Sequence, residues 1–316
     1  MNSTRKKILK TTLPLLLGGV LVWYSLAGMD QEKMITHLKT ANYGWIFLGL
    51  FFGVLSHLSR AYRWKFMLAP MGYKPKFTNS VLAVLIGYFV NLAIPRAGEV
   101  SRATVMVNYE NIPFQKGFGT IVAERIADMI MMFLIIGITL FFQFDYILAL
   151  VSENFNPIKI GFLLLGIIGA TIVFTSFVKK AKQGFLLKIK NFILSLVEGV
   201  TSILKMEKKW AFIFHTFFIW TMYVAMFWAT IPAIQGLEVP VGGILVGFIA
   251  GGFSIAATNG GIGSYPLAVM GAILLFNVPE SPSEAFGWIM WSAQTLMIIV
   301  FGGLAFLVLP IYNKKK

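Results

Sequence analysis

Residues 79–107 read NSVLAVLIGYFVNLAIPRAGEVSRATVMV, and they contain the most informative break in the chain. The stretch is apolar up to Ile94 and is then broken by Pro95-Arg96-Ala97-Gly98. Proline lacks a backbone N–H and disfavours helix in the residue before it, and glycine gives the backbone conformational freedom. We therefore expect the chain to turn at this break and to form two short helices instead of one long one.

The composition places this hairpin in a membrane protein. Hydrophobic residues make up 57% of the 316 residues and charged residues only 13%, and the mean hydropathy is +0.77. Average soluble proteins carry roughly 25% charged residues. A soluble enzyme, a disordered scaffold and a disulfide-stapled secreted domain are thereby excluded. Because the chain has no cysteine and three histidines, we expect no metal site and no cofactor.

Uninterrupted apolar segments predict six full transmembrane helices, because a bilayer core about 30 Å thick needs roughly 20 apolar residues per crossing. They lie near residues 11–28, 43–66, 117–142, 158–178, 210–231 and 285–310. A second interrupted stretch covers 241–257 and 264–277, and it is broken at Thr258-Asn259-Gly260-Gly261-Ile262-Gly263. The fold class that we expect is an all-α, polytopic membrane protein.

The positions of lysine and arginine predict how the chain is oriented. The net charge is +14, and most basic residues cluster beside apolar segments, near residues 5–10, 60–65, 179–182 and 314–316. Such clusters are typical of the cytoplasmic side of membrane proteins, so we expect both termini in the cytoplasm and no binding of nucleic acid. Since the acidic loop with Asp145 and Glu153 should lie outside, the stretch 79–107 must enter and leave on the cytoplasmic side. The same count of membrane crossings, with Lys314–Lys316 inside, requires residues 241–277 to enter and leave on the outer side.

The order of these elements predicts internal symmetry. Residues 1–142 contain a span, a span, a hairpin from the inside and a span. Residues 158–316 contain the same four elements in the opposite orientation. This order is typical of the inverted repeats of transporters, and we expect a single integral membrane domain over residues 1–316. Eight ordinary crossings with two kinked helices are the alternative, but they would place the lysines of 179–208 on the wrong side.

Charged and turn-forming residues inside the predicted membrane segments are candidates for a transport site, because ionisable groups in a bilayer are costly and mark substrate or ion paths. They gather at the first hairpin turn, on the helix 117–142 and near the end of the helix 43–66. These candidates are Arg60, Arg63, Asn91, Pro95, Arg96, Gly98, Glu99, Arg102, Glu124, Arg125 and Asp128.

A structural role is the alternative for the charges of the hairpin and of the helix 117–142. Glu99 falls in the first turn of the returning helix, where a carboxylate suits the helix dipole, and it can pair with Arg102 three residues on. Glu124, Arg125 and Asp128 should face the bundle interior near the first hairpin. They can serve transport or lock the hairpin to the helix.

The basic residues near the end of the helix 43–66 also admit two interpretations. Arg60 and Arg63 can bind the phosphate of a lipid headgroup, or they can extend to the membrane surface and fix the topology. Trp64 beside them is typical of an aromatic anchor at the membrane interface.

The second hairpin turn offers backbone groups instead of charges. Its glycines expose N–H groups beside the start of a short helix, which favours an anion. A flexible turn is the alternative. The candidate residues here are Asn259, Gly260, Gly261, Gly263 and Tyr265.

These motifs together resemble the lysylphosphatidylglycerol synthase transmembrane, or flippase-like, family. The matching segments are Arg60-Ala-Tyr-Arg63-Trp64, residues 87–103, Glu124-Arg125-Ile-Ala-Asp128 and Gly260-Gly261-Ile262-Gly263. The resemblance implies a bacterial inner-membrane protein that moves a lipid or a lipid-linked headgroup between leaflets. In two-domain members a separate cytosolic domain performs aminoacyl transfer, so that activity is not expected of this sequence. Pro266 stands where many relatives carry an acidic residue.

We therefore expect a lipid flippase or transporter and not an enzyme, since no P-loop, nucleophile elbow, zinc-protease or dinucleotide motif occurs. One alternative is a membrane-embedded enzyme on a lipid-linked substrate, with Glu99 or Glu124 as general base. Another is a non-transporting scaffold for cell-envelope synthesis.

The charge balance of the candidate residues predicts the partner. Five arginines stand against three carboxylates, and buried guanidinium groups in excess need an anion. We expect anionic or phosphate-bearing membrane lipids as partners, with Arg96 and Arg102 nearest the headgroup. A homo-oligomer is compatible with the sequence.

Overall fold

The computed structural model describes residues 30–144 and 205–314, together with the isolated positions 19, 20, 22, 23, 183, 187 and 203. The predicted helix at 158–178 and most of the one at 11–28 lie outside the described residues. Within the described ranges every regular element is a helix, and no strand occurs. The all-α class is therefore confirmed for this part of the chain.

Four of the described helices are long and apolar enough to cross a membrane. They are α3 (Tyr43–Leu68), α6 (Phe114–Phe142), α10 (Lys209–Thr230) and α13 (Glu280–Tyr312). The shortest has 22 residues, which at 1.5 Å per residue gives about 33 Å. The crossings predicted at 43–66, 117–142, 210–231 and 285–310 are thus confirmed as helices of sufficient length.

The first interrupted segment is a hairpin of two short helices, α4 (Phe77–Ala93) and α5 (Ala97–Glu110). Arg96 lies in the turn between them with a φ of 62°, in the left-handed region. The two helices are in close contact, because a Cβ on Gly98 would overlap the carbonyl oxygen of Gly87. Asn79 of α4 donates a side-chain hydrogen bond to Glu110 of α5. The chain therefore enters and leaves this hairpin at the same end, as predicted.

The second interrupted segment forms a similar hairpin from α11 (Val241–Ala257) and α12 (Ser264–Leu274). Its turn contains three glycines with φ between 66° and 77°, a conformation that few other residues adopt: Gly260, Gly261 and Gly263. At the open end, a Cβ on Gly243 would contact the ring of Phe276. The breaks predicted at 95–98 and 258–263 are both confirmed.

The two ends of the helix bundle differ in charge. One, which we call the basic end, holds the open end of the first hairpin and the C-terminus of α13, where Asn79 and Asn313 exchange hydrogen bonds of 3.1 and 2.9 Å. Its lysines include Lys74, Lys76, Lys116, Lys205, Lys208, Lys209 and Lys314.

The opposite, acidic end holds α2 (Gln31–Thr40), the short 3₁₀ helix η2 (Ile231–Ala233) and the open end of the second hairpin. His37 of α2 hydrogen-bonds Ser281 at the start of α13, at 3.1 Å. The acidic residues there are Asp30, Glu32, Glu238, Glu280 and Glu284. A second 3₁₀ turn, η1 (Ala69–Met71), follows α3 at the basic end. This separation of charge agrees with the predicted assignment of loops to two sides.

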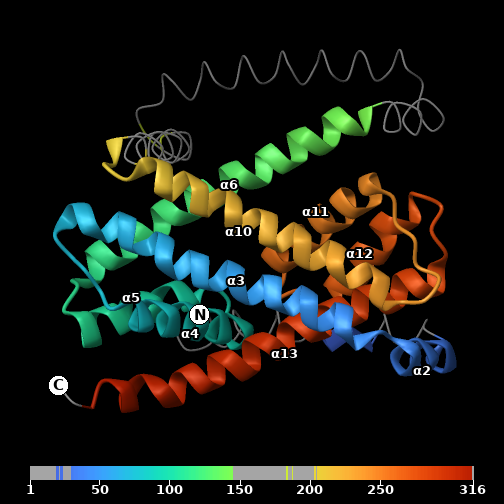
Figure 1. The fold of residues 1–316 in the computed structure, drawn as a ribbon, viewed down its shortest axis with the longest axis horizontal. Coiled ribbons are helices and arrows are strands. Elements are labelled where there is room, and N and C mark those ends of the chain that lie inside the picture. The colour runs from blue at the N-terminus through green and yellow to red at the C-terminus, as the bar shows by residue number, and fades with distance from the viewer. Residues whose placement is uncertain are drawn as a thin grey trace.

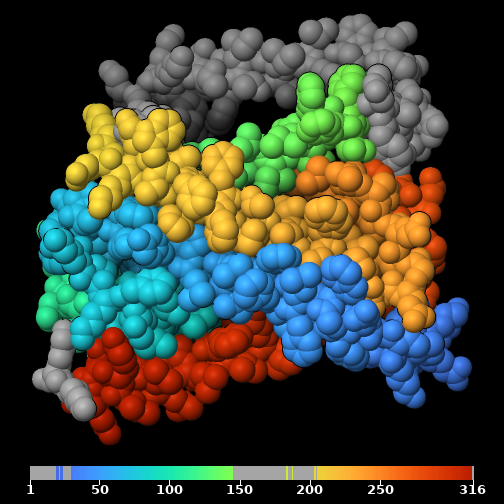
Figure 2. Space-filling model, viewed as in Figure 1, coloured from blue at the N-terminus to red at the C-terminus, as the bar shows by residue number. Residues whose placement is uncertain are grey.

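The hairpins extend from opposite ends, and their turns meet in the middle of the bundle (Figure 1). The Asn259 side chain donates a 2.7 Å hydrogen bond to the backbone carbonyl of Leu92. Trp291 of α13 donates to the carbonyl of Gly260 at 2.9 Å. Along the outside, α3 lies against α10, as Figure 2 shows. The long helices thus enclose a central region where two helix breaks face each other.

Candidate functional site

Five charged side chains from α3, α5 and α6 form a buried ion-pair network beside the first hairpin. They are Arg60, Arg63, Arg102, Glu124 and Asp128. Residues three or four apart share a face of a helix. The two arginines of α3 therefore face the two carboxylates of α6.

Each carboxylate of the network binds more than one arginine. Arg102 donates from both terminal nitrogens to the two oxygens of Glu124, at 3.2 and 3.1 Å. Arg60 donates to Glu124 and, at 2.7 Å, to Asp128. Arg63 donates to the other Asp128 oxygen at 3.2 Å. These bonds join α3, α5 and α6 into one unit.

Hydroxyl groups extend the network to α10 and α4. Arg63 donates a 2.7 Å hydrogen bond to Thr216 of α10. Arg60 lies 3.4 Å from the Tyr223 hydroxyl, which is 3.1 Å from the hydroxyl of Tyr88 on α4. The sequence prediction missed these three hydroxyl residues. Their only local signal is that Thr216 and Tyr223 are seven residues apart and so share a helix face.

The network has three arginines and two carboxylates, and aromatic rings lie against two of these guanidinium groups. The Arg102 guanidinium lies 4.4 Å from the centre of the Trp64 ring, and that of Arg63 lies 5.1 Å from Phe212. Such contacts stabilise a desolvated cation by about 2 kcal/mol. Trp64 is fully buried and donates its indole N–H to Thr120 at 2.8 Å. The prediction of Trp64 as an interfacial anchor is therefore wrong, because the ring has a cation and a hydrogen-bond acceptor inside the bundle.

The burial of the network shows whether Arg60 and Arg63 extend to the membrane surface. Their side chains are 3% and 0% exposed. Extension to the membrane surface as topology determinants is therefore wrong for both, because the carboxylates of α6 hold them inside. The Nε atoms of Arg60, Arg63 and Arg102 have no hydrogen-bond partner among the described residues.

A second ion pair lies at the first hairpin turn and is partly open. Arg125 donates to Glu99 at 2.7 Å, and their side chains are 42% and 19% exposed. Glu99 thus pairs with Arg125 and not with Arg102, which is turned toward Glu124. Arg125 also lies 3.8 Å from Asp128, so this pair adjoins the buried network. Glu124 and Asp128 face the bundle interior as predicted, whereas Arg125 reaches its surface.

The backbone break of the first hairpin is stabilised locally. Asn91 accepts a 2.7 Å hydrogen bond from the Gly98 N–H, across the turn. Pro95 and Arg96 lie exposed at the tip. In the part of the chain that the structure describes, no hydrogen bond or ion pair engages the Arg96 side chain.

The turn of the second hairpin is tightly packed. Tyr265 is buried against Gly251, and its N–H donates to the Gly261 carbonyl at 2.9 Å. Asn259 is also buried, and its Oδ1 accepts no hydrogen bond from any described residue. At least one backbone N–H group at this turn therefore donates to the turn itself and is not available to an anion.

Hydroxyl groups that the sequence prediction missed surround this second turn. Ser264 lies 2.6 Å from the hydroxyl of Ser254 and 2.9 Å from that of Thr258. The second turn is therefore closed by neutral groups, in contrast to the charged network beside the first. Within residues 30–144 and 205–314, no three His, Asp or Glu side chains are arranged to hold a metal ion.

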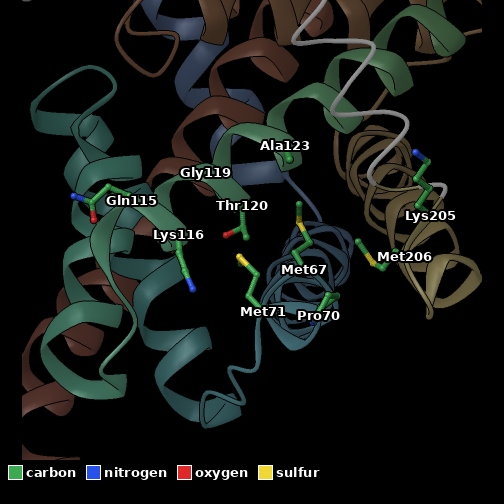
Figure 3. Close-up of a pocket in the computed structure, with 10 residues that line it drawn as sticks. All are labelled: Met67, Pro70, Met71, Gln115, Lys116, Gly119, Thr120, Ala123, Lys205 and Met206. Atoms are coloured by element: carbon green, nitrogen blue, oxygen red, sulfur yellow. The ribbon is translucent and has the colours of Figure 1, made fainter.

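A cavity of about 530 Å³ lies at the basic end between α3 and α6. In Figure 3, Lys116 and Thr120 of α6 face Met67 and Met71 across it. Thr120 is the acceptor for Trp64, so the cavity ends beside the buried network. Nothing in the sequence pattern predicted this space, because its walls come from helices far apart in the chain.

Comparisons with known proteins found a matching family profile and two partly similar sequences. The profile of a family described as the lysylphosphatidylglycerol synthase TM region matches residues 12–303. A UPF0104 membrane protein of Methanocaldococcus jannaschii is 32% identical over 125 residues, which cover 39% of this chain and 37% of that protein. A protein named glycosyltransferase AglD, of Haloferax volcanii, is 29% identical over 113 residues, or 35% of this chain and 18% of that protein. The chain thus matches less than two fifths of the length of either relative. No solved structure matches it significantly.

Proposed function

The chain belongs to the lysylphosphatidylglycerol synthase transmembrane-region family, as its motifs predicted, and from this premise we propose that it moves a phosphate-bearing lipid or lipid-linked headgroup between leaflets. We propose no catalytic activity for it. The architecture that goes with this function is two inverted repeats, about residues 1–142 and 158–316, with six full transmembrane helices and two re-entrant hairpins.

The observation that carries the proposal is the meeting of two helix breaks in the middle of the bundle. The 17 residues of α4 bring its turn about 25 Å from the basic end. There Asn259 of the second turn bonds Leu92 of the first. Irregular backbone at membrane depth occurs only where it is buried in protein or lines a wet cavity. Transporters place their substrate sites at such discontinuous helices near the midplane.

The buried network argues against Glu124 as a general base. A general base needs a free oxygen within hydrogen-bond reach of its substrate. Glu124 is fully buried, and both of its oxygens are held by arginines. Of the two carboxylates considered as a base, only Glu99 is accessible. We therefore assign the network a structural role in holding the first hairpin to α3 and α6.

We propose the bacterial inner membrane as the location, with the basic end and both termini in the cytoplasm. The lysines of the basic end support this orientation, since cytoplasmic segments are enriched in lysine and arginine. The acidic residues of α2 and of the start of α13 would then face outward.

A scaffold for synthesis of a lipid-linked product is the second candidate, and the relative named as a glycosyltransferase favours it. The matched segment there is a small part of that protein. In that case the membrane domain would hold a lipid for a partner enzyme without moving it across.

Reconstitution in liposomes separates these functions. Purified protein is incorporated with trace fluorescent phosphatidylglycerol, phosphatidylethanolamine or polyprenyl phosphate, and a membrane-impermeant quencher measures the labelled lipid in the outer leaflet over time. We expect exchange of at least one phosphate-bearing lipid well above the rate of protein-free liposomes. Exchange at the protein-free rate for every lipid would refute the transport function and favour the scaffold.

A further inference from the structure

Two of the five predicted site arginines remain available to a ligand. The terminal nitrogens of Arg60, Arg63 and Arg102 are bonded to the carboxylates of α6, and these side chains are at most 4% exposed. Arg96 is exposed without a partner in the described ranges, and Arg125 is 42% exposed with Glu99 as its closest partner. The guanidinium groups that a ligand can reach are therefore Arg96, in the first hairpin turn, and Arg125, on α6 beside it.

These two arginines lie at membrane depth. Arg96 follows α4, at about 25 Å from the basic end, and Arg125 comes eleven residues after the start of α6, at about 17 Å. The hydrocarbon core of a bilayer is about 30 Å thick. A charged side chain that faces lipid tails there carries a large free-energy cost. Both groups therefore need water or an anion beside them.

The sequence leaves no further carboxylate for Arg96. The chain has 13 acidic residues, and at membrane depth the described ones are Glu99, Glu124 and Asp128. The predicted helices at 11–28 and 158–178, outside the described residues, contain no acidic residue in their sequence. Arg96, Arg125 and Glu99 together carry one positive charge in excess, and an anionic ligand would balance it.

The surroundings of the two arginines are apolar and open to the outside of the bundle. Val100 on α5, and Val122 and Ile130 on α6, are each 43–47% exposed. Val100 directly follows Glu99, and Val122 lies three residues before Arg125 and Ile130 five residues after it. A ligand with a charged head and a hydrocarbon tail fits this combination better than a free inorganic anion does.

We propose that Arg96 and Arg125 together bind the phosphate of a lipid headgroup that enters sideways from the bilayer, and that the phosphate displaces Glu99 from Arg125. The guanidinium fork matches phosphate geometry and makes paired, charge-assisted hydrogen bonds. The inference rests on the proposed transport function and names the binding residues for it. The sequence prediction placed Arg96 and Arg102 nearest the headgroup. Because Glu124 engages Arg102 in the structure, Arg125 takes the place of Arg102 here.

Binding to the purified full chain in detergent tests the site. The probes are farnesyl phosphate, farnesol as its uncharged counterpart, and inorganic phosphate. We expect farnesyl phosphate to bind and to raise Tm, inorganic phosphate to bind at least tenfold more weakly, and farnesol to have no effect. Arg96→Gln and Arg125→Gln should each weaken farnesyl phosphate binding about tenfold or more. Glu99→Gln should strengthen it, because it removes the competing carboxylate.

Matched variants control for charge and folding. Lys116→Gln removes a positive charge from the same helix as Arg125, within the cavity of the basic end, and should leave the affinity unchanged. Arg96→Lys and Arg125→Lys retain the charge and should restore part of the affinity. They also serve if a glutamine variant fails to fold. Arg96 is exposed, so the Tm of ligand-free Arg96→Gln should equal that of the wild type, whereas Arg125→Gln loses the pair with Glu99 and should have a lower Tm.

Three results would overturn the site: equal binding of farnesol and farnesyl phosphate, wild-type affinity in both glutamine variants, or loss of affinity in Lys116→Gln instead. The liposome assay separates the site from the function. If the wild type exchanges lipids and both arginine variants do so at the same rate, the site is wrong and transport stands. If the arginine variants lose binding but the wild type exchanges no lipid, the site stands and transport is wrong.

Discussion

Replacing Glu124 by Gln should destabilise the protein strongly, because it leaves three buried guanidinium groups with one carboxylate. Loss of one partner of a buried ion pair costs about 3–5 kcal/mol. Native proteins are stable by about 5–15 kcal/mol, so this is a large share of the total. The measurement is the free energy of unfolding in mixed micelles by denaturant titration. A tenfold change in the unfolding equilibrium constant corresponds to about 1.4 kcal/mol, so we expect this constant to rise by roughly two to three and a half orders of magnitude.

Two variants show whether the ion pairs cause the loss. Glu280→Gln removes an exposed carboxylate at the start of α13 and should change the free energy of unfolding by less than about 0.5 kcal/mol. Adding Arg102→Met to Glu124→Gln removes one of the unpaired cations. The double variant should therefore be more stable than the sum of the single changes predicts, by about 0.5–3 kcal/mol. A Glu124→Gln variant as stable as the wild type would show that these ion pairs do not stabilise the fold.

Three further predictions follow from the fold. Cysteines introduced at positions 74 and 110 of this cysteine-free chain should react with an impermeant thiol reagent from the same side of the membrane, and labelling from opposite sides would contradict the first hairpin. Gly98→Ala should lower stability by about 1–3 kcal/mol, because its Cβ would overlap Gly87, whereas Gly119→Ala has open space and should be neutral or stabilising in thermal unfolding. Similar Tm values for the two would be inconsistent with the close helix contact. Asn259→Ala leaves the Leu92 carbonyl without its bond and should cost about 1–3 kcal/mol. An unchanged Tm would show that the two turns do not depend on this contact.

The long helices that the structure describes and the two breaks could be predicted from the sequence alone. Hydrophobicity and the effects of proline and glycine are local, so the break after Ile94 and the glycine turn at 260–263 could be placed from single segments. The same applies to charge: the clusters of lysine predicted which loops share an end, and Asn79 and Glu110 meet accordingly. The helices expected at 11–28 and 158–178 stay predictions.

Which charged side chains pair with one another could be seen only in the folded protein. Helical spacing placed Glu99 and Arg102 on one face, but it says nothing about what lies opposite that face. In the folded protein Arg102 meets Glu124 and Glu99 meets Arg125. Trp64 lies inside for the same reason, since its cation and its acceptor come from α5 and α6. Partners on distant helices cannot be inferred from local periodicity, because they depend on how the helices pack against one another.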